Sequence, residues 1–337
     1  MDKNGLITLA HGSGGQSSHE LMSEIFGKYF SNPILDRLED AAVLPMGDPL
    51  GIETGTMAVS TDSFVVTPLF FPGGDIGKIA ACGTVNDLLM MGAEPRYLTC
   101  GFILEEGLPL SQLDKICDSM KEQADQAGVI IVAGDTKVVD GRGGIYINTT
   151  GIGYIPNERN IGAANIKPGD AILLSGNLGE HQTAIYSTRL EGENDIESDC
   201  AVLKDVTDAL YGAGVVPRAM RDVTRGGLGT ILNELAQAAG CGMNIGETLL
   251  PITERVKSFA DILGFDPLYM ANEGKLVAIV REKDAARALS AMRQTEHGKN
   301  AALIGHVSGG RGVTLVTPNG GVRSVDVLYG EGLPRIC

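Results

Sequence analysis

Strand-like and helix-like segments alternate along both halves of this 337-residue chain, and that alternation limits the folds open to it. Short β-branched or apolar runs predict strands, and apolar residues spaced three or four positions apart predict helices. The alternation is typical of mixed α/β domains, although the order of the segments does not decide whether the sheets are parallel. Because the length is about twice that of a typical domain, we expect two domains.

The first predicted domain covers residues 1–160. Its expected elements, in chain order, are a helix at 17–30, a strand at 57–60, a helix at 75–91, a strand at 97–104, a helix at 111–128, and strands at 129–134 and 145–155. The turn-rich stretch 162–170 follows, and it predicts a domain boundary at about this point.

The second predicted domain covers residues 161–327. Its expected strands lie at 171–176, 275–280, 301–307, 313–317 and 322–328, and its expected helices at 179–190, 200–212, 228–239 and 283–294. Residues 328–337 contain two Gly and one Pro, so we expect a mobile tail there rather than another packed element.

The chain is acidic, with 27 Lys and Arg against 42 Asp and Glu and a formal net charge of −15. Such a field repels nucleic-acid backbones and anionic membrane surfaces. No apolar run approaches the roughly 20 residues that span a bilayer, and the N-terminus has no basic segment followed by an apolar one. We therefore expect a cytoplasmic protein that binds neither nucleic acid nor membrane. If its substrate is a nucleotide, metal ions or backbone N–H groups must offset the negative field.

The six cysteines contain no C-x-x-C pair, which disfavours a structural zinc site or a disulfide framework. Five of them lie among apolar or small residues and are expected to be buried: Cys82, Cys100, Cys117, Cys200 and Cys241. Cys337 differs, because it is the last residue of the predicted tail. From Tyr329 an extended tail reaches roughly 26 Å, so its thiol can visit more than one site. A terminal cysteine without a role is the alternative.

Carboxylates beside Gly or at strand ends are a second chemical signal. Asp40, Asp62, Asp135 and Asp222 stand in such turns, where an Asp also commonly forms an Asx turn or caps a helix. Asp87 differs, because it falls on the apolar stripe of the helix predicted around it. A carboxylate in that position needs a metal ion or the cation of a structural ion pair.

Two glycine-rich turns precede predicted helices, one at 11–15 and one at 225–229. Free backbone N–H groups in such turns receive phosphate oxygens, and a plain turn is the alternative. Neither a Walker loop nor a G-x-G-x-x-G after a strand is present. The candidate phosphate-binding residues of the two turns are His11, Gly12, Gly14, Gly15, Arg225, Gly226 and Gly227.

Two further charged residues are candidates for proton transfer. Lys137, two positions after Asp135, is a possible phosphate ligand or proton donor. Glu273, beside a Gly, is a candidate base. Solvated surface charges are the alternative for both.

Over essentially its whole length the chain resembles the HypE family of hydrogenase maturation factors. The motifs that carry the resemblance are LAHGSGG (9–15), STDSFVVTPLFFPGGDIGK (60–78), CGTVNDLLMMGAEP (82–95), AGDTKVV (133–139), RDVTRGGL (221–228), DPLYMANEGK (266–275) and the terminal PRIC. The Asp and Gly motifs are shared with a wider ATP-using superfamily of aminoimidazole ribonucleotide synthetase, selenophosphate synthetase and thiamine-monophosphate kinase. The PRIC terminus singles out the maturation factors. One departure is Gln182, where the family pattern has Gly.

The resemblance implies an N-terminal sheet that pairs with the sheet of a second copy to form a barrel, and a C-terminal α/β domain packed against it. It also implies a reaction. A HypF-type carbamoyltransferase loads a carbamoyl group onto Cys337, and ATP then drives dehydration of the S-carboxamide to an S-cyano group. The cyanide passes to iron held by a HypC–HypD complex and becomes a ligand of the [NiFe] hydrogenase iron.

The same resemblance assigns roles within the site. Magnesium is assigned to Asp40, Asp87 and Asp222, in keeping with the oxygen ligands that this ion prefers. ATP contacts are assigned to Asp62, Asp135, Thr136 and the two glycine-rich turns. Lys137 and Glu273 polarise the amide and remove the proton, and the sequence leaves open which residue does which.

Two other classes of function fit the same residues. One is a non-catalytic carrier that presents Cys337 to partners and uses ATP only as a conformational ligand. The other is a small-molecule kinase of the same superfamily, which would turn over freely and would not need Cys337.

Overall fold

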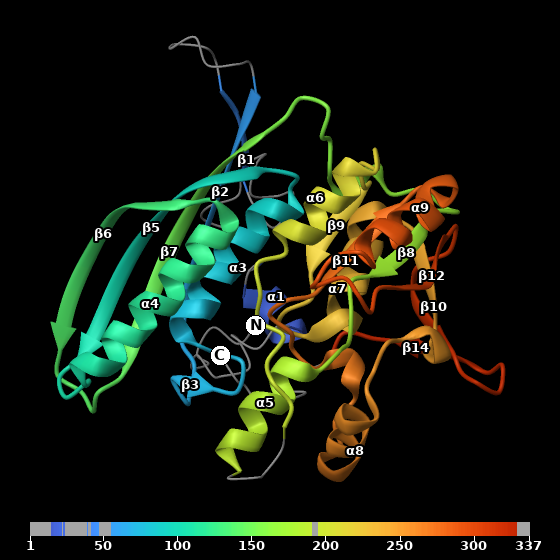
Figure 1. The fold of residues 1–337 in the computed structure, drawn as a ribbon. Coiled ribbons are helices and arrows are strands. Elements are labelled where there is room, and N and C mark those ends of the chain that lie inside the picture. The colour runs from blue at the N-terminus through green and yellow to red at the C-terminus, as the bar shows by residue number, and fades with distance from the viewer. Residues whose placement is uncertain are drawn as a thin grey trace.

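The computed structural model describes residues 15–21, 23, 39, 42–46, 55–190 and 195–328. Two sheets with helices packed against them lie side by side, one built from the N-terminal half and one from the C-terminal half (Figure 1). The expectation of a mixed α/β fold with two domains is confirmed. The boundary between residues 160 and 161 stays a prediction. It falls between the last strand of the first sheet, which ends at Ile155, and the first strand of the second, which begins at Ala171.

The N-terminal sheet has five strands in the order β1, β2, β7, β5, β6. They are β1 (Ala42–Met46), β2 (Gly55–Phe64), β7 (Ile145–Ile155), β5 (Glu94–Glu105) and β6 (Ile130–Val139). All neighbours are antiparallel except β5 and β6, which are parallel. The sheet is open, so the described residues of one chain form no closed barrel.

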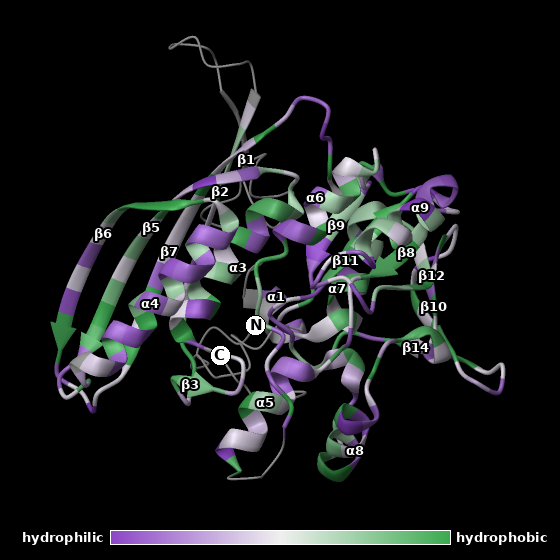
Figure 2. Cartoon of the chain, viewed as in Figure 1, coloured by the Kyte–Doolittle hydropathy of each residue, from purple (hydrophilic) through white to green (hydrophobic). Residues whose placement is uncertain are grey.

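The helices that the structure describes cover one face of this sheet (Figure 1). The other N-terminal elements among the described residues are α1 (Gln16–Leu21), α3 (Ile76–Met90), α4 (Leu110–Ala127) and the two short strands β3 (Phe70–Phe71) and β4 (Gly74–Asp75). Along β7, buried side chains alternate with exposed or half-buried ones, as a strand covered on one face requires. All ten residues of β6 are exposed. Figure 2 shows this edge strand as apolar at both ends with a hydrophilic stretch between them.

Helix α3 lies at the centre of the molecule, and every one of its residues except Lys78 and Asp87 is buried. Asp75 caps it, because its carboxylate accepts hydrogen bonds from Gly77 N (2.7 Å) and Lys78 N (3.1 Å). The amphipathic stripe expected for this helix is therefore wrong. Asp87 stands out because it is only half-buried on a helix that is packed on nearly all sides.

The C-terminal sheet has seven strands in the order β14, β13, β10, β12, β8, β11, β9. They are β14 (Val322–Val325), β13 (Gly312–Val316), β10 (Gly242–Gly246), β12 (Ala302–Ser308), β8 (Ala171–Leu174), β11 (Leu276–Val280) and β9 (Ala219–Asp222). The pair β10 and β13 is parallel, and the other pairs are antiparallel. Every residue of β8 and of β11 is buried, so these two strands form the centre of the second core.

Helices pack against this second sheet. The α-helices are α5 (Glu180–Arg189), α6 (Lys204–Gly212), α7 (Gly227–Ala239), α8 (Glu254–Leu263) and α9 (Glu282–Met292). Short 3-10 turns occur at η4 (Ala163–Asn165), η5 (Glu247–Leu249) and η6 (Pro267–Tyr269). None of the helices described is both long and apolar enough to cross a membrane.

Several short elements were not predicted, namely β1, β3, β4, β9, β10 and α8. The strands among them are only two to five residues long, too short for a periodic pattern. The expected strand 322–328 ends earlier, at Val325. The helix expected at 17–30 begins as α1, and most of its remainder, like the tail after Leu328, lies outside the described residues.

Four of the five internal cysteines are buried as expected, but Cys117 is exposed. It lies in α4, whose core-facing positions are taken by neighbours such as Ile116 and Met120. A helix turns by about 100° per residue, so the position next to a buried one points outward.

Candidate functional site

Three carboxylates from separate elements meet at the junction of the two domains. Asp62 lies on β2, Asp222 ends β9, and Glu273 lies in the loop before β11. Burial raises the pKa of Asp222 to about 6, and the charge of Asp62 acts in the same direction. Burial also raises the pKa of Asp62, while Arg225 lowers it. The structure therefore brings together carboxylates that the sequence could identify only one by one.

Glu273 is the most strongly perturbed member of this cluster. Burial raises its pKa well above the ordinary value, and the charges of Asp222, Asp199 and Asp62 add to that effect. Arg225 opposes them. A raised carboxyl pKa is common among residues that exchange protons in enzymes.

Asp87 approaches the same junction from α3. Ser60, on β2, donates a hydrogen bond from Oγ to Asp87 Oδ2 at 2.6 Å. Ser60 and Asp62 are two positions apart on one strand, so they share a face of the sheet. Helix α3 also contacts β9, the strand that ends at Asp222. The structure thus directs two of the three predicted magnesium ligands toward one region, and the third, Asp40, lies outside the described residues.

A glycine turn opens helix α7 beside these carboxylates. Gly226 and Gly227 have φ angles of 76° and 61°, in the region that favours glycine. A Cβ on Gly227 would lie 2.6 Å from Leu268 O, so the turn also requires close backbone packing. Arg225 precedes the turn, and its charge acts on Asp62, Asp222 and Glu273.

The first glycine turn is only partly visible, because His11, Gly12 and Gly14 lie outside the described residues. Gly15 has a φ of 82°, and a Cβ there would lie 2.5 Å from Leu328 O. Gln16 N donates to the same carbonyl at 3.2 Å. The end of this turn therefore contacts the base of the tail that carries Cys337, itself outside the described residues.

Asp135, Thr136 and Lys137 do not join the cluster within one chain. They lie on β6, the outer strand of the N-terminal sheet, on the side away from the C-terminal domain (Figure 1). Lys137 Nζ binds Asp135 Oδ1 and Oδ2 at 2.8 and 2.6 Å. Their side chains are 67% and 71% exposed. The hydrogen bond from Lys137 lowers the pKa of Asp135.

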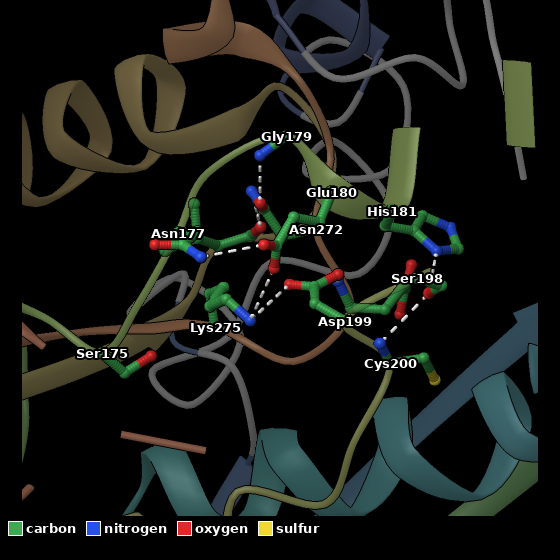
Figure 3. Close-up of polar contacts among 12 residues, drawn as sticks. Ser175, Asn177, Gly179, Glu180, His181, Ser198, Asp199, Cys200, Asn272 and Lys275 are labelled. Carbon is green, nitrogen blue, oxygen red and sulfur yellow. Dashed lines mark hydrogen bonds and ion pairs between the residues drawn. The ribbon is translucent and has the colours of Figure 1, made fainter. Parts of the chain in front are cut away.

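A buried polar network around Asp199 and Lys275 was not predicted (Figure 3). Asp199 Oδ1 accepts a hydrogen bond from Glu273 N at 3.1 Å, and Asp199 Oδ2 lies 3.2 Å from Lys275 Nζ. Lys275 Nζ also lies 3.6 Å from Glu180 Oε2. Charged residues in otherwise apolar motifs, such as SDCAVL at 198–203, were the available signal, but their partners are distant in sequence.

His181 forms a second part of this network. It is fully buried, its Nδ1 lies 2.7 Å from Ser198 Oγ, and its ring meets Phe71 edge to face with centroids 5.5 Å apart. Burial lowers its pKa to about 4, although the charge of Asp199 acts the other way. The imidazole is therefore neutral at physiological pH.

Gln182, which departs from the family pattern, has a defined place. It lies inside α5, and the positive φ of 82° before this helix belongs to Gly179. Gln182 N donates to Ala271 O at 3.2 Å, and Gln182 Oε1 accepts from Ala271 N at 2.8 Å. The glutamine thus supports the loop that carries Glu273.

The donor chemistry of the junction suits magnesium. Desolvated carboxylates with raised pKa values create a negative potential that a divalent cation offsets. No group of three His, Cys, Asp or Glu side chains within the described ranges is already arranged as a set of metal ligands. Asp87 and Asp222 supply oxygen donors of the kind that magnesium prefers.

Comparison with known proteins identifies the class. Models of the AIR synthase related protein family match residues 38–155 with the N-terminal domain and residues 167–317 with the C-terminal domain. The carbamoyl dehydratase HypE of Rhodobacter capsulatus is 47% identical over 341 residues, which cover 98% of each chain. The chain belongs to the carbamoyl dehydratase HypE family of enzymes, as the motifs indicated.

Solved structures of HypE proteins also match this chain. A crystal structure of a HypE–HypF complex matches with a TM-score of 0.85 and 44% identity, over 91% of this chain and 99% of the other. A structure of the hydrogenase maturation protein HypE in complex with ATP matches with a TM-score of 0.80 and 46% identity, over 98% and 100% of the two chains.

Proposed function

We propose that this chain converts an S-carboxamide on Cys337 into an S-cyano group at the expense of ATP, which supplies cyanide for [NiFe] hydrogenase maturation. The observation that carries the proposal is the cluster of Asp62, Asp222 and Glu273, with raised pKa values at the domain junction. The similarity to carbamoyl dehydratases over the whole chain supports the same reaction.

The reaction has two steps. The carboxamide oxygen attacks the γ-phosphorus of ATP, and ADP leaves. The C–O bond of the phosphorylated amide then breaks, phosphate departs, both N–H protons leave the nitrogen, one to Glu273 and one to solvent, and the C≡N bond forms. Without phosphorylation the leaving group would be oxide or hydroxide, so this step needs ATP.

Glu273 is the base in this scheme. Its raised pKa makes the ionised carboxylate a stronger base than an ordinary glutamate, and so better matched to the weakly acidic N–H proton. The Arg225–Gly227 turn at the start of α7 receives phosphate oxygens. Asp87 and Asp222, together with Asp40, hold magnesium, which when bound offsets the charge of the phosphates.

Lys137 acts across a dimer contact. Within one chain, β6 lies on the side of the sheet away from Glu273. The strand exposes a row of apolar side chains that needs a cover, including Ile130 (61% exposed) and Val138 (69% exposed). We propose that a second copy covers them through its own sheet, which closes the barrel and makes Lys137 a residue of the interface.

The proposed partners follow from the chemistry of Cys337. A relative forms a complex with HypF, and a HypF-type carbamoyltransferase is the proposed source of the carbamoyl group here. A HypC–HypD complex is the proposed iron carrier that receives cyanide. Both must reach a cysteine at the end of the tail.

The deciding experiment is mass spectrometry of Cys337 after incubation with a carbamoyl donor, the HypF-type enzyme and Mg-ATP. We expect the carbamoyl adduct to lose one water and one phosphate to be released per chain. Cys337→Ala should bind ATP normally and give no adduct. Glu273→Gln should accept the carbamoyl group and fail to dehydrate it.

Other outcomes would replace the proposal. Cyanide transfer by Cys337→Ala would exclude the covalent route. An adduct that binds ATP but neither loses water nor releases phosphate would favour the ATP-gated carrier, and repeated turnover on a free small molecule without Cys337 would favour a kinase.

A further inference from the structure

The segment 195–203 contacts both domains, α3 on one side and the loop that carries Glu273 on the other. It runs between α5 and α6 without regular secondary structure. On the N-terminal side, Asn86 of α3 donates from Nδ2 to Ala201 O at 3.0 Å and accepts from Leu203 N at 2.9 Å. Asn86 is 1% exposed, so both hydrogen bonds are shielded from water. The segment is therefore tied to the helix that also carries Asp87.

On the C-terminal side, the segment contacts the Glu273 loop through Asp199. The Asp199 side chain is 1% exposed, and its Oδ1 accepts from Glu273 N at 3.1 Å. The two backbones also touch, because a Cβ on Gly274 would lie 1.8 Å from Asp199 O. The carboxylate and the close backbone contact together hold the loop against the segment.

The charge of Asp199 is balanced locally. Lys275 Nζ lies 3.2 Å from Asp199 Oδ2 and 3.6 Å from Glu180 Oε2. A buried carboxylate without a cation would be strongly unfavourable, so Lys275 allows Asp199 to serve as a charged acceptor. A charged acceptor binds a backbone N–H more strongly than a neutral one.

We infer that Asp199 is a positioning residue, which fixes the backbone of Glu273 relative to α3 and Asp87 through the segment that Asn86 anchors. This inference rests on the proposed role of Glu273 as base. Its consequence is that Asp199 acts on the dehydration step and leaves ATP binding unaffected, because the proposed ATP contacts lie on other elements.

The test compares two neutral double variants, one with and one without a side-chain oxygen that can accept from Glu273 N–H. Asp199→Asn/Lys275→Met removes both charges and keeps a side-chain oxygen. Asp199→Ala/Lys275→Met removes both charges and the oxygen. The full-length chain, carbamoylated on Cys337, is mixed with saturating Mg-ATP, and phosphate release and S-cyano formation are followed in a single turnover.

We expect the Asn/Met variant to keep most of the wild-type rate constant. The Ala/Met variant should be slower by about 10²-fold, which is the effect of a displacement of roughly 1 Å in a catalytic group. The ATP concentration that gives half-saturation should be the same in both. Equal rate constants for the two variants would overturn the inference, as would a loss confined to ATP affinity.

Two controls keep the result interpretable. If the Ala/Met variant does not fold, Asp199→Ser/Lys275→Met replaces it, because serine is polar but too short to reach Glu273 N. Amide hydrogen exchange at Glu273 should then be faster in the Ser/Met than in the Asn/Met variant, and equal exchange would refute the positioning contact. Failure of wild-type protein to dehydrate its adduct would refute the proposed function, whereas equal rates beside an active wild type refute only the role of Asp199.

Discussion

At the scale of single residues, burial decides which ionisable groups of this protein are chemically unusual. Within one chain, Lys137 and Asp135 form an exposed ion pair on β6, and such pairs contribute little to stability. Glu273 and Asp222 are candidates from the sequence as well, and the fold removes them from water beside other carboxylates. Burial beside other carboxylates raises a carboxyl pKa strongly, whereas exposure on a strand does not.

His181 gives a prediction for acid stability. Its pKa of about 4 in the folded protein lies below the ordinary value of 6.5 because the ring is buried. Between these values the unfolded chain binds a proton that the folded chain does not, so stability falls as the pH drops through this window. From pH 7 to pH 5 the loss attributable to this group is about 2 kcal/mol.

Urea unfolding at the two pH values checks this prediction. His181→Asn keeps a partner for Ser198 Oγ and cannot be protonated, so the difference between pH 7 and pH 5 should shrink by about 2 kcal/mol relative to wild type. An unchanged difference would show that the ring is protonated in the folded state.

At the scale of elements, close packing of α3 against its neighbours places the site residues. Helix α3 carries Asn86 and Asp87 and contacts β2, β7, α4 and β9. Its approach to α4 depends on Gly77, where a Cβ would lie 2.2 Å from Ile116 O. Backbone atoms cannot move aside as the end of a flexible side chain can, so this contact allows no larger residue.

Gly77→Ala should therefore destabilise the protein by at least about 2 kcal/mol, since the inserted methyl group must separate α3 from α4. Gly212→Ala is the matched control, because a Cβ at this position in α6 meets nothing within 4 Å. It should be neutral or stabilise by about 0.5–1 kcal/mol. Chemical denaturation of both variants measures the difference, and similar effects of the two substitutions would contradict the packing argument.

At the scale of the whole molecule, the N-terminal sheet is incomplete in one chain. Helices cover one face, and its outer strand β6 leaves Ile130 and Val138 exposed. Ile130 pairs with Tyr97 and Val138 with Leu104 of β5, and the register shift between Leu98 and Thr99 places the two side chains on opposite faces of the strand. An exposed apolar edge of this kind favours pairing with another chain.

We expect light scattering to show a dimer at micromolar concentration. Val138→Glu should raise the dimer dissociation constant at least about tenfold, because a charge would replace an aliphatic side chain that the dimer buries. Ile262→Glu is the control, since Ile262 on α8 is 82% exposed but lies in the C-terminal half. A monomeric wild-type protein, or equal weakening by both variants, would refute dimerisation through this sheet.

Local patterns in the sequence were enough to predict most of the longer elements and the fold class. The strand 145–155 has the predicted bounds, and α3 and α4 agree with the predicted helices to within one residue at each end. These helix ends are predictable because the residues that set them are adjacent in sequence: Asp75 is the N-cap of α3, and Gly128 is the C-cap of α4. The family could also be recognised, because its motifs are contiguous stretches of sequence.

Burial, and contacts between residues distant in sequence, could not be predicted from local patterns. The contact of Asp199 with Glu273 joins residues 74 positions apart, and the contact of Asn86 with Leu203 joins residues 117 positions apart. No local pattern encodes such separations, because they depend on how two sheets and one buried helix pack together. The same packing leaves Lys137 in solvent and encloses Glu273, since electrostatic character follows from the surrounding dielectric and charges rather than from residue type.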